Sequence, residues 1–268
     1  MNSPLLTYYD LAPDATAFSS TRHGGRSCGS YGEFNINRYC GDDASAVAYN
    51  RTALCSLLGI DDSRLVMPHQ THGTVIRRIT DGFFALPPAG RRSFLEGVDA
   101  LMTDVPEICI GVSTADCIPI IIYDSRNRAS CVVHAGWRGT VRKIAVSAVR
   151  AMTESYGSCP DELKCCIGPG ISKDNFEVGD EVYEEFAGAG FDMSRISDRH
   201  DKWHIDLWKC NSLQLESAGV VSANIHVSGI CTYSNCDDYF SARRLGIASG
   251  RIFTGIILRN ALIKNPCL

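Results

Sequence analysis

Four apolar runs that follow one another between residues 98 and 134 constrain the possible folds of this chain most strongly. Each run, such as Ile118–Tyr123 or Ala129–His134, is six residues long, and only a few turn-forming or polar residues separate it from the next. Runs of this length favour strands over helices. The same signals predict strands at Ala15–Thr21, Arg64–Pro68, Thr74–Thr80, Val98–Thr103, Ile108–Ser113, Leu163–Ile167 and Asn224–Ile230, with further strands after Tyr239.

Helices are fewer than strands in this pattern. The clearest begins at Ala44, with Asp42 or Asp43 as N-cap, and ends at Leu58, with Gly59 as C-cap. Because strands and helices are interspersed without a strict alternation of strand, helix and strand, the pattern favours an α+β layered fold over a doubly wound sheet. Further helices are predicted at Thr140–Ser155, Gly179–Ala187 and Ile205–Ala218.

The chain shows no division into domains. It has no repeat of fixed period and no linker rich in Pro, Gly or Ser, and its 268 residues are within the range of one compact domain. We therefore expect residues 1–268 to form a single domain. The segment Asp81–Glu96 contains Pro87, Pro88 and Gly90 and predicts a surface loop.

Composition and charge exclude several classes of protein. With 26 Lys and Arg against 30 Asp and Glu, the net charge is -4, and no basic run is long enough to bind a nucleic acid. The longest apolar stretch, around Ile118–Tyr123, is too short to span a membrane. The 13 cysteines are odd in number and irregularly spaced, so they do not indicate a disulfide framework. Because Asp10 and Asp14 interrupt the N-terminal region, no signal peptide is predicted and we expect a cytoplasmic protein.

Three segments combine metal-binding side chains with positions at predicted strand ends. They contain His72, Cys117 and His134, and a His, Cys, His set supplies three of the ligands that Zn²⁺ prefers while leaving a fourth position for water or substrate. The separations, from 72 to 117 and from 117 to 134, are much longer than zinc-finger spacings. The ligands would therefore converge only through the fold.

Residue types alone leave other interpretations open. A cysteine beside an apolar strand is often a small buried side chain. Cys117 could also act as a thiolate nucleophile, with His134 or His72 as its base and Asp116 nearby. This second hypothesis describes a metal-free Cys/His hydrolase or amidase.

A set of motifs in one order gives the chain a family resemblance. The motifs are Thr21-Arg22-His23-Gly24-Gly25, Phe34-Asn35-Ile36-Asn37, Gly41-Asp42-Asp43 with Asn50-Arg51, Gln70-Thr71-His72-Gly73, Thr114-Ala115-Asp116-Cys117-Ile118-Pro119, His134-Ala135-Gly136-Trp137-Arg138-Gly139, Ile167-Gly168-Pro169-Gly170-Ile171 and Phe240-Ser241-Ala242-Arg243-Arg244. With these motifs the chain resembles the purine nucleoside phosphorylase family long labelled multicopper polyphenol oxidase or laccase-like, over about Phe18 to Leu258.

The resemblance implies a fold, a metal and a reaction. It implies an α/β/β/α layered sandwich, shared distantly with Cys/His deamidase toxins, that forms a single catalytic domain. It also implies one metal ion, usually Zn²⁺, with His72, Cys117 and His134 as ligands; copper is the less favoured metal. The implied activities are phosphorolysis of adenosine, inosine and S-methyl-5'-thioadenosine, with hydrolytic deamination of adenosine. His69, ahead of Gln70, departs from the common pattern, and we leave it out of the ligand set because it would face away from His72 on a strand.

These reactions suggest roles for further residues. Deamination needs a proton shuttle, for which Asp116 is a candidate, although it could equally orient a ligand or cap a turn. Phosphorolysis needs cations for phosphate, and we expect a purine nucleoside and phosphate as partners of a monomer. A copper polyphenol oxidase needs many more His ligands than the seven His of this chain. The candidate phosphate-binding residues are Arg22, Arg138, Arg243 and Arg244.

Overall fold

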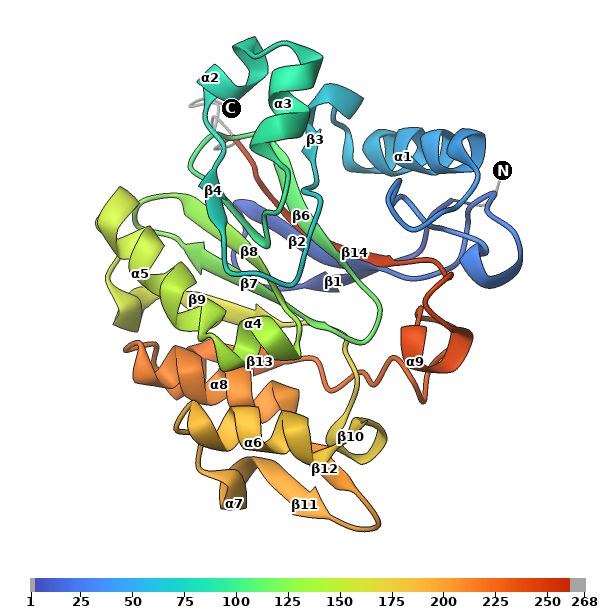
Figure 1. The fold of residues 1–268 in the computed structure, drawn as a ribbon. Coiled ribbons are helices and arrows are strands. Elements are labelled where there is room, and N and C mark those ends of the chain that lie inside the picture. Colours follow the sequence, from blue (N-terminus) through green and yellow to red (C-terminus); the bar gives the residue numbers. More distant parts are fainter. Residues whose placement is uncertain (1–2, 261–268) are drawn as a thin grey trace.

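Two β-sheets packed face to face form the centre of the protein, and helices cover both outer faces (Figure 1). The computed structural model describes residues 3–260. One sheet has five strands in the order β1-β2-β14-β6-β3, and β14 pairs antiparallel with both β2 and β6. Its strands are β1 (Leu6–Tyr9), β2 (Ala15–Ser20), β3 (Leu65–Val66), β6 (Cys109–Thr114) and β14 (Ile252–Leu258).

The second sheet has six strands in the order β13-β9-β7-β8-β5-β4. Its centre is antiparallel, while the two edge strands, β13 and β4, each run parallel to their neighbour. Chain segments from both halves of the sequence therefore meet in one sheet. The strands are β4 (Ile76–Arg78), β5 (Ala100–Thr103), β7 (Ile118–Asp124), β8 (Ala129–Ala135), β9 (Lys164–Ile167) and β13 (Ile225–Val227).

Alternation along β7 explains how the six-stranded sheet is buried on both faces. Ile120 and Ile122 pack into the cluster on the helix side, whereas Ile121 and Tyr123 pack into the cluster between the sheets. Successive side chains of a strand point to opposite faces, so an all-apolar strand fits only a doubly covered sheet.

Helices complete the two outer layers. α5 (Ile144–Tyr156) and α8 (Leu207–Ser217) contribute to the cluster on the outer face of the six-stranded sheet, and α1 (Ala44–Leu58) packs against the outer face of the five-stranded sheet. The layer order is α/β/β/α, which confirms the predicted α+β layered fold. α1 also confirms its predicted ends, because the Asp43 carboxylate accepts a hydrogen bond from the backbone N–H of Ala46 and Gly59 is left-handed with φ 66°.

Two predictions of local structure were wrong. The segment predicted as a surface loop, Asp81–Glu96, contains α2 (Asp81–Ala85) and α3 (Pro88–Phe94), and Pro88 stands in the first turn of α3, where its missing N–H costs no hydrogen bond. The helix predicted at Thr140–Ser155 is two helices, α4 (Trp137–Val141) and α5, because Lys143 adopts a left-handed conformation between them.

A small third sheet and several short elements lie outside this sandwich, next to α6 (Asp180–Gly188) and α7 (Met193–Ile196). The sheet has the order β10-β12-β11 and was not predicted, since its strands have only two or three residues. No helix within residues 3–260 is long and apolar enough to cross a membrane. The remaining strands and helix are β10 (Glu177–Val178), β11 (Ser197–Arg199), β12 (Trp203–Ile205) and α9 (Ala242–Leu245).

Candidate metal centre

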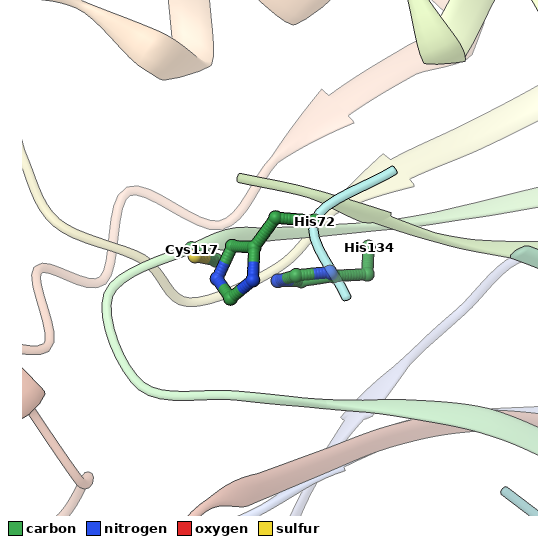
Figure 2. Close-up of side chains that lie close together, drawn as sticks. All are labelled: His72, Cys117 and His134. Atoms are coloured by element: carbon green, nitrogen blue, oxygen red, sulfur yellow. The ribbon is translucent and has the colours of Figure 1, made fainter. Parts of the chain in front are cut away.

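Two loops and the end of one strand bring His72, Cys117 and His134 together. His72 lies between β3 and β4, Cys117 between β6 and β7, and His134 near the end of β8. Each offers one ligand atom, and these atoms all lie within 4.8 Å of one another (Figure 2). The pairing of β7 with β8 explains part of this convergence, because it sets Pro119 opposite His134 and so places Cys117 near that histidine.

The backbone in both of these loops is left-handed at residues other than glycine. His72 has φ 60° and Asp116, directly before Cys117, has φ 84°. Such conformations cost of order 1–3 kcal/mol and persist where surrounding contacts impose them. Contacts around the two loops therefore fix the backbone at His72 and beside Cys117, and with it the positions of these two side chains.

Asp99 is the buried residue that holds two of the three segments. One carboxylate oxygen lies 2.7 Å from Nδ1 of His134 and accepts a hydrogen bond of 3.0 Å from the backbone N–H of His72; the other accepts one of 2.7 Å from Gly73. Asp99 has no exposed surface. Sequence reasoning missed this residue, although an acidic side chain inside the apolar run Val98–Thr103 was a signal for it.

These contacts fix the orientation of the His134 imidazole. With Nδ1 bonded to a carboxylate, the ring presents Nε2 to the site, as is common for metal-binding histidines. The pKa of Asp99 is lowered, because hydrogen bonds from His134 and the loop N–H groups outweigh the effect of burial, which raises it. Asp99 is thus an ionised anchor for the site.

Cys117 and His134 shift each other's pKa in the directions that favour a thiolate and an imidazolium. Burial alone would raise the pKa of the Cys117 thiol. The charge of His134 and hydrogen bonds with His134 and His72 together outweigh burial and lower this pKa to about 6. For His134, burial lowers the pKa, while Cys117 and Asp99 together raise it to about 9. A thiolate is the form in which cysteine binds a metal or acts as a nucleophile.

Gly136 leaves the space that this ligand set requires. A Cβ at this position would lie 2.9 Å from Cδ2 of His72, 3.0 Å from Sγ of Cys117 and 3.6 Å from Nε2 of His134. Any larger residue would push into the centre of the three ligands. The imidazole and thiolate donors, their proximity and this open space fit a Zn²⁺ ion.

The ligands open onto a cavity of about 330 Å³. Gln70 shapes its wall, because the Gln70 amide donates to the backbone oxygen of Ser113 and accepts from its N–H, both at 2.8 Å. Tyr39 and His69 stack in the wall with ring centroids 4.3 Å apart. The lining residues are Asn37, Tyr39, Cys40, His69, Gln70, His72, Ser113, Thr114, Ala115, Cys117, His134, Ala242, Ile247 and Arg251.

Comparison with known families agrees with this geometry. The model of the family described as multi-copper polyphenol oxidoreductase laccase matches residues 16–259. The chain belongs to this family. The resemblance seen in its motifs is therefore confirmed, and curated relatives show what proteins of this laccase family can do.

Two relatives are similar over nearly their whole length. A purine nucleoside phosphorylase of Bacteroides thetaiotaomicron is 45% identical over 244 residues, which cover 90% of each chain. An adenosine deaminase, RL5, of an unknown prokaryotic organism is 46% identical over 243 residues, which cover 90% of this chain and 92% of the relative. The chain is thus a homologue of enzymes that act on purine nucleosides.

Solved structures of similar proteins share the fold. The YfiH hypothetical protein of Bacillus licheniformis superposes with a TM-score of 0.90 at 29% identity, over 96% of this chain and 97% of that one. YlmD of Geobacillus stearothermophilus gives a TM-score of 0.86 at 30% identity and covers 94% of both chains.

The name of this laccase family does not match the candidate metal ligands of the chain. Among residues 3–260, His72, Cys117 and His134 are the one group of three or more His, Cys, Asp or Glu side chains arranged to hold a metal ion. A cluster of several coppers would need more ligands than this group offers. The site is instead typical of a single metal ion with an open coordination position.

The carboxylate of Asp116 has hydrogen-bond partners outside the group of His72, Cys117 and His134. One oxygen accepts a hydrogen bond of 2.7 Å from the Thr232 hydroxyl, and the other accepts one of 2.7 Å from the backbone N–H of Arg243 at the start of α9. In this arrangement Asp116 joins the Cys117 loop to α9. Its role as a proton shuttle stays a prediction.

The four arginines expected at phosphate have side chains outside the cavity wall. Arg22 donates to the backbone oxygens of Gly32 and Cys236, and Arg243 donates to that of Glu177. Arg138 lies over the Trp137 ring and Arg244 over the Tyr233 ring.

Arg251 is the one arginine that lines the cavity among the described residues, and sequence reasoning missed it. Its guanidinium donates to the backbone oxygens of Ser249, Gly250 and Ile247 at 2.6, 2.9 and 3.0 Å. A weak signal was its place directly after Ser249-Gly250, ahead of the last strand.

His69 lies in the cavity wall together with His72. Residues 70–75 are not in a strand and His72 is left-handed, so the strand geometry that would turn the two side chains to opposite faces is not formed. His69 is still outside the ligand group, and its Nδ1 lies 2.7 Å from the Glu96 carboxylate.

Proposed function

We propose that this chain is a zinc-dependent purine nucleoside phosphorylase that also deaminates adenosine. The observation that carries the proposal is the convergence of His72, Cys117 and His134 on one cavity, in a chain 45% identical to a purine nucleoside phosphorylase and 46% identical to an adenosine deaminase. The substrates would be adenosine, inosine and S-methyl-5'-thioadenosine, together with phosphate.

His72, Cys117 and His134 would hold the Zn²⁺ ion. Two imidazoles and a thiolate are ligands that zinc shares with copper, and we propose zinc because it needs no redox partner in these reactions. Bound zinc supplies a Lewis acid at neutral pH. Asp99 would keep His134 in the ligating tautomer, and Gly136 would keep the centre open.

The remaining cavity wall would bind the nucleoside and phosphate. The stacked rings of Tyr39 and His69 offer a flat face for a purine. Arg251 offers a guanidinium whose position is fixed by three backbone oxygens, as a phosphate site requires. Departure of the purine needs a proton donor. His69, whose Nδ1 lies 2.7 Å from the Glu96 carboxylate, would supply the proton from Nε2 when both ring nitrogens are protonated.

One observation favours a second candidate function. Asp99, His134 and Cys117 are linked in the order of a carboxylate, imidazole and thiol triad, and the pKa of Cys117 is lowered to about 6. A metal-free cysteine hydrolase or amidase would use such a pair. A cysteine hydrolase would not explain why His72 lies beside Cys117 and His134, so we rank this function second.

A product assay separates the two functions. We expect the zinc-loaded protein to form ribose 1-phosphate and free purine from inosine only when phosphate is present, and to release ammonia from adenosine without phosphate. Chelation should abolish both reactions, and zinc should restore them. Amide hydrolysis that survives chelation and is lost on thiol alkylation would contradict the proposal and support the cysteine hydrolase.

We further propose that the chain acts as a single catalytic domain and as a monomer, because the described residues of one chain supply the whole cavity. A cytoplasmic location is consistent with the cysteines of the described chain, which are all free. Reducing compartments keep thiols in this state.

A further inference from the structure

A second cavity, of about 260 Å³, lies beside the first and is lined by four arginines. We call it the arginine pocket and define it by Arg38, Arg51, Arg91 and Arg92. Its walls come from the segment before α1, from α1, from the turn after α1, and from β3, α2 and α3. Tyr39 lines both cavities, so the pocket adjoins the catalytic cavity but does not contain its metal ligands.

The pocket carries an excess of positive charge. Asp62 is the one carboxylate in its lining, and Oδ1 of Asp62 lies 3.4 Å from Nε of Arg51. Burial lowers the pKa of Arg51, Asp62 opposes this, and the charge of Arg38 lowers it further. Arg38 and Arg51 line the same pocket, and an anion bound there would reduce the repulsion between their like charges.

Two of the four guanidiniums have structural partners and two do not. Arg51 donates to the backbone oxygen of Leu65, and Arg91 donates to those of Leu86 and Phe84. Within residues 3–260, no hydrogen bond or ion pair engages the side chain of Arg38 or Arg92, and both residues are exposed. Guanidiniums held by backbone oxygens therefore lie beside guanidiniums whose N–H donors are free. This combination suits a ligand that carries several acceptor oxygens.

Apolar side chains line the pocket beside the arginines. Met67 and Phe83 are buried and Leu95 is half-buried, and all three contribute to the lining. A phosphate ester would meet both parts, with its oxygens at the guanidiniums and its carbon skeleton on the apolar wall. Arg91, Arg92 and Phe83 come from the helical segment 81–94 to which the proposed reaction assigns no role.

We propose that the arginine pocket is a second ligand site, separate from the catalytic cavity, which binds the phosphate group of a small phosphorylated molecule or free phosphate. Planar guanidinium forks match phosphate oxygens in geometry and charge. The proposal does not depend on the reaction that the catalytic cavity performs, because binding is measured directly.

Calorimetric titration of the zinc-loaded full chain tests the site. The probes are inorganic phosphate, adenosine 5'-monophosphate and adenosine, in a buffer free of phosphate. The test variant is Arg38→Ala/Arg92→Ala, which removes only exposed side chains without a partner. The matched control is Arg142→Ala/Arg195→Ala, which removes two exposed arginines, one directly after α4 and one in α7, and gives the same net charge.

We expect the test variant to weaken binding of the phosphate-bearing probe by about tenfold or more, through loss of charge-assisted contacts. The control should bind as the wild type does, and adenosine binding should be equal in all three proteins. Tighter binding of the monophosphate would identify a phosphate ester as the ligand, and tighter binding of inorganic phosphate would identify the free ion.

Two results would overturn the proposal. Equal phosphate binding by the test variant and the wild type would show that the arginines hold no phosphate. A raised KM for phosphate in phosphorolysis by the test variant would show that the pocket belongs to the catalytic site. The product assay of the wild type reports on the proposed function separately, so the two can fail independently.

Discussion

Asp99→Asn tests how the protein holds its candidate metal ligands. The substitution keeps the size of the side chain but removes the charge, and it replaces one acceptor oxygen by an NH₂ donor. In the native site Asp99 accepts from His134 and from the backbone N–H groups of His72 and Gly73. An asparagine oxygen can serve only part of this set, so at least one buried donor loses its acceptor.

The structure gives the expected magnitude. A buried donor without an acceptor costs about 1–3 kcal/mol, and more is lost because the hydrogen bonds to a charged carboxylate are the stronger kind. We therefore expect the metal-free variant to be less stable by about 2–4 kcal/mol at pH 7. Zinc affinity should fall by about 10–100-fold, the usual effect of losing the partner of a ligating histidine.

The acid dependence of stability should change as well. The pKa of Asp99 in the folded protein is below its ordinary value. Its contribution is therefore fully present above the unfolded pKa of about 3.9 and is lost as the pH falls through the folded pKa. The free energy of unfolding of Asp99→Asn should therefore fall less than that of the wild type as the pH is lowered through this range.

Urea unfolding and zinc competition titration measure the two effects. Asp124→Asn is the control, because Asp124 is a buried carboxylate with a lowered pKa that accepts from backbone N–H groups at the turn after β7. The control should lose stability but keep its zinc affinity. If Asp99→Asn binds zinc as tightly as wild type, Asp99 does not position the ligands and our description of the site is incorrect.

Three further predictions concern the same cavity. Gly136→Ala should weaken zinc binding by about tenfold or more, because its Cβ would meet His72 and Cys117 at 2.9 and 3.0 Å. Gly188→Ala, where a Cβ meets nothing within 4 Å, is the control, and equal zinc affinities of the two variants would refute the prediction. Iodoacetamide should alkylate metal-free Cys117 with a half-maximal rate near pH 6, because the thiolate forms as the pH rises through a lowered pKa; a midpoint near the usual value of about 8.5 would contradict the thiolate pair. Arg251→Ala should raise the KM for phosphate by about 10–100-fold, the value of a charged hydrogen bond of about 1.5–3 kcal/mol, while inosine binding changes little; an unchanged KM would place phosphate elsewhere.

Much of the fold could be predicted because its signals are local. The apolar runs of β5 to β8 mark strands without reference to the rest of the chain, and Asp43 and Gly59 mark the ends of α1 through hydrogen bonds within a few residues. The segment Asp81–Glu96 was misassigned because its prolines are typical of loops, whereas Pro88 in the structure begins a helix. The third sheet escaped prediction because two- and three-residue strands depend on tertiary pairing.

The metal ligands could be predicted, but not the residues that support them. Their convergence depends on pairing between strands distant in sequence, such as β3 with β6, β5 with β8 and β14 with β6, which no local pattern encodes. Asp99 and Arg251 acquire their roles only through this pairing and through the loops it brings together. The partners of Asp116 could not be predicted either, because Thr232 and Arg243 are distant in sequence and reach its carboxylate only through the fold.

Zinc content measured together with inosine phosphorolysis, on the wild type and on Cys117→Ala, tests the central claim most directly. We expect about one zinc per wild-type chain, in keeping with a single three-ligand site, and ribose 1-phosphate formation that requires both zinc and phosphate. The variant, which keeps His72 and His134 but loses the thiolate, should lose zinc and activity together. Full phosphorolysis by a zinc-free protein would contradict the account.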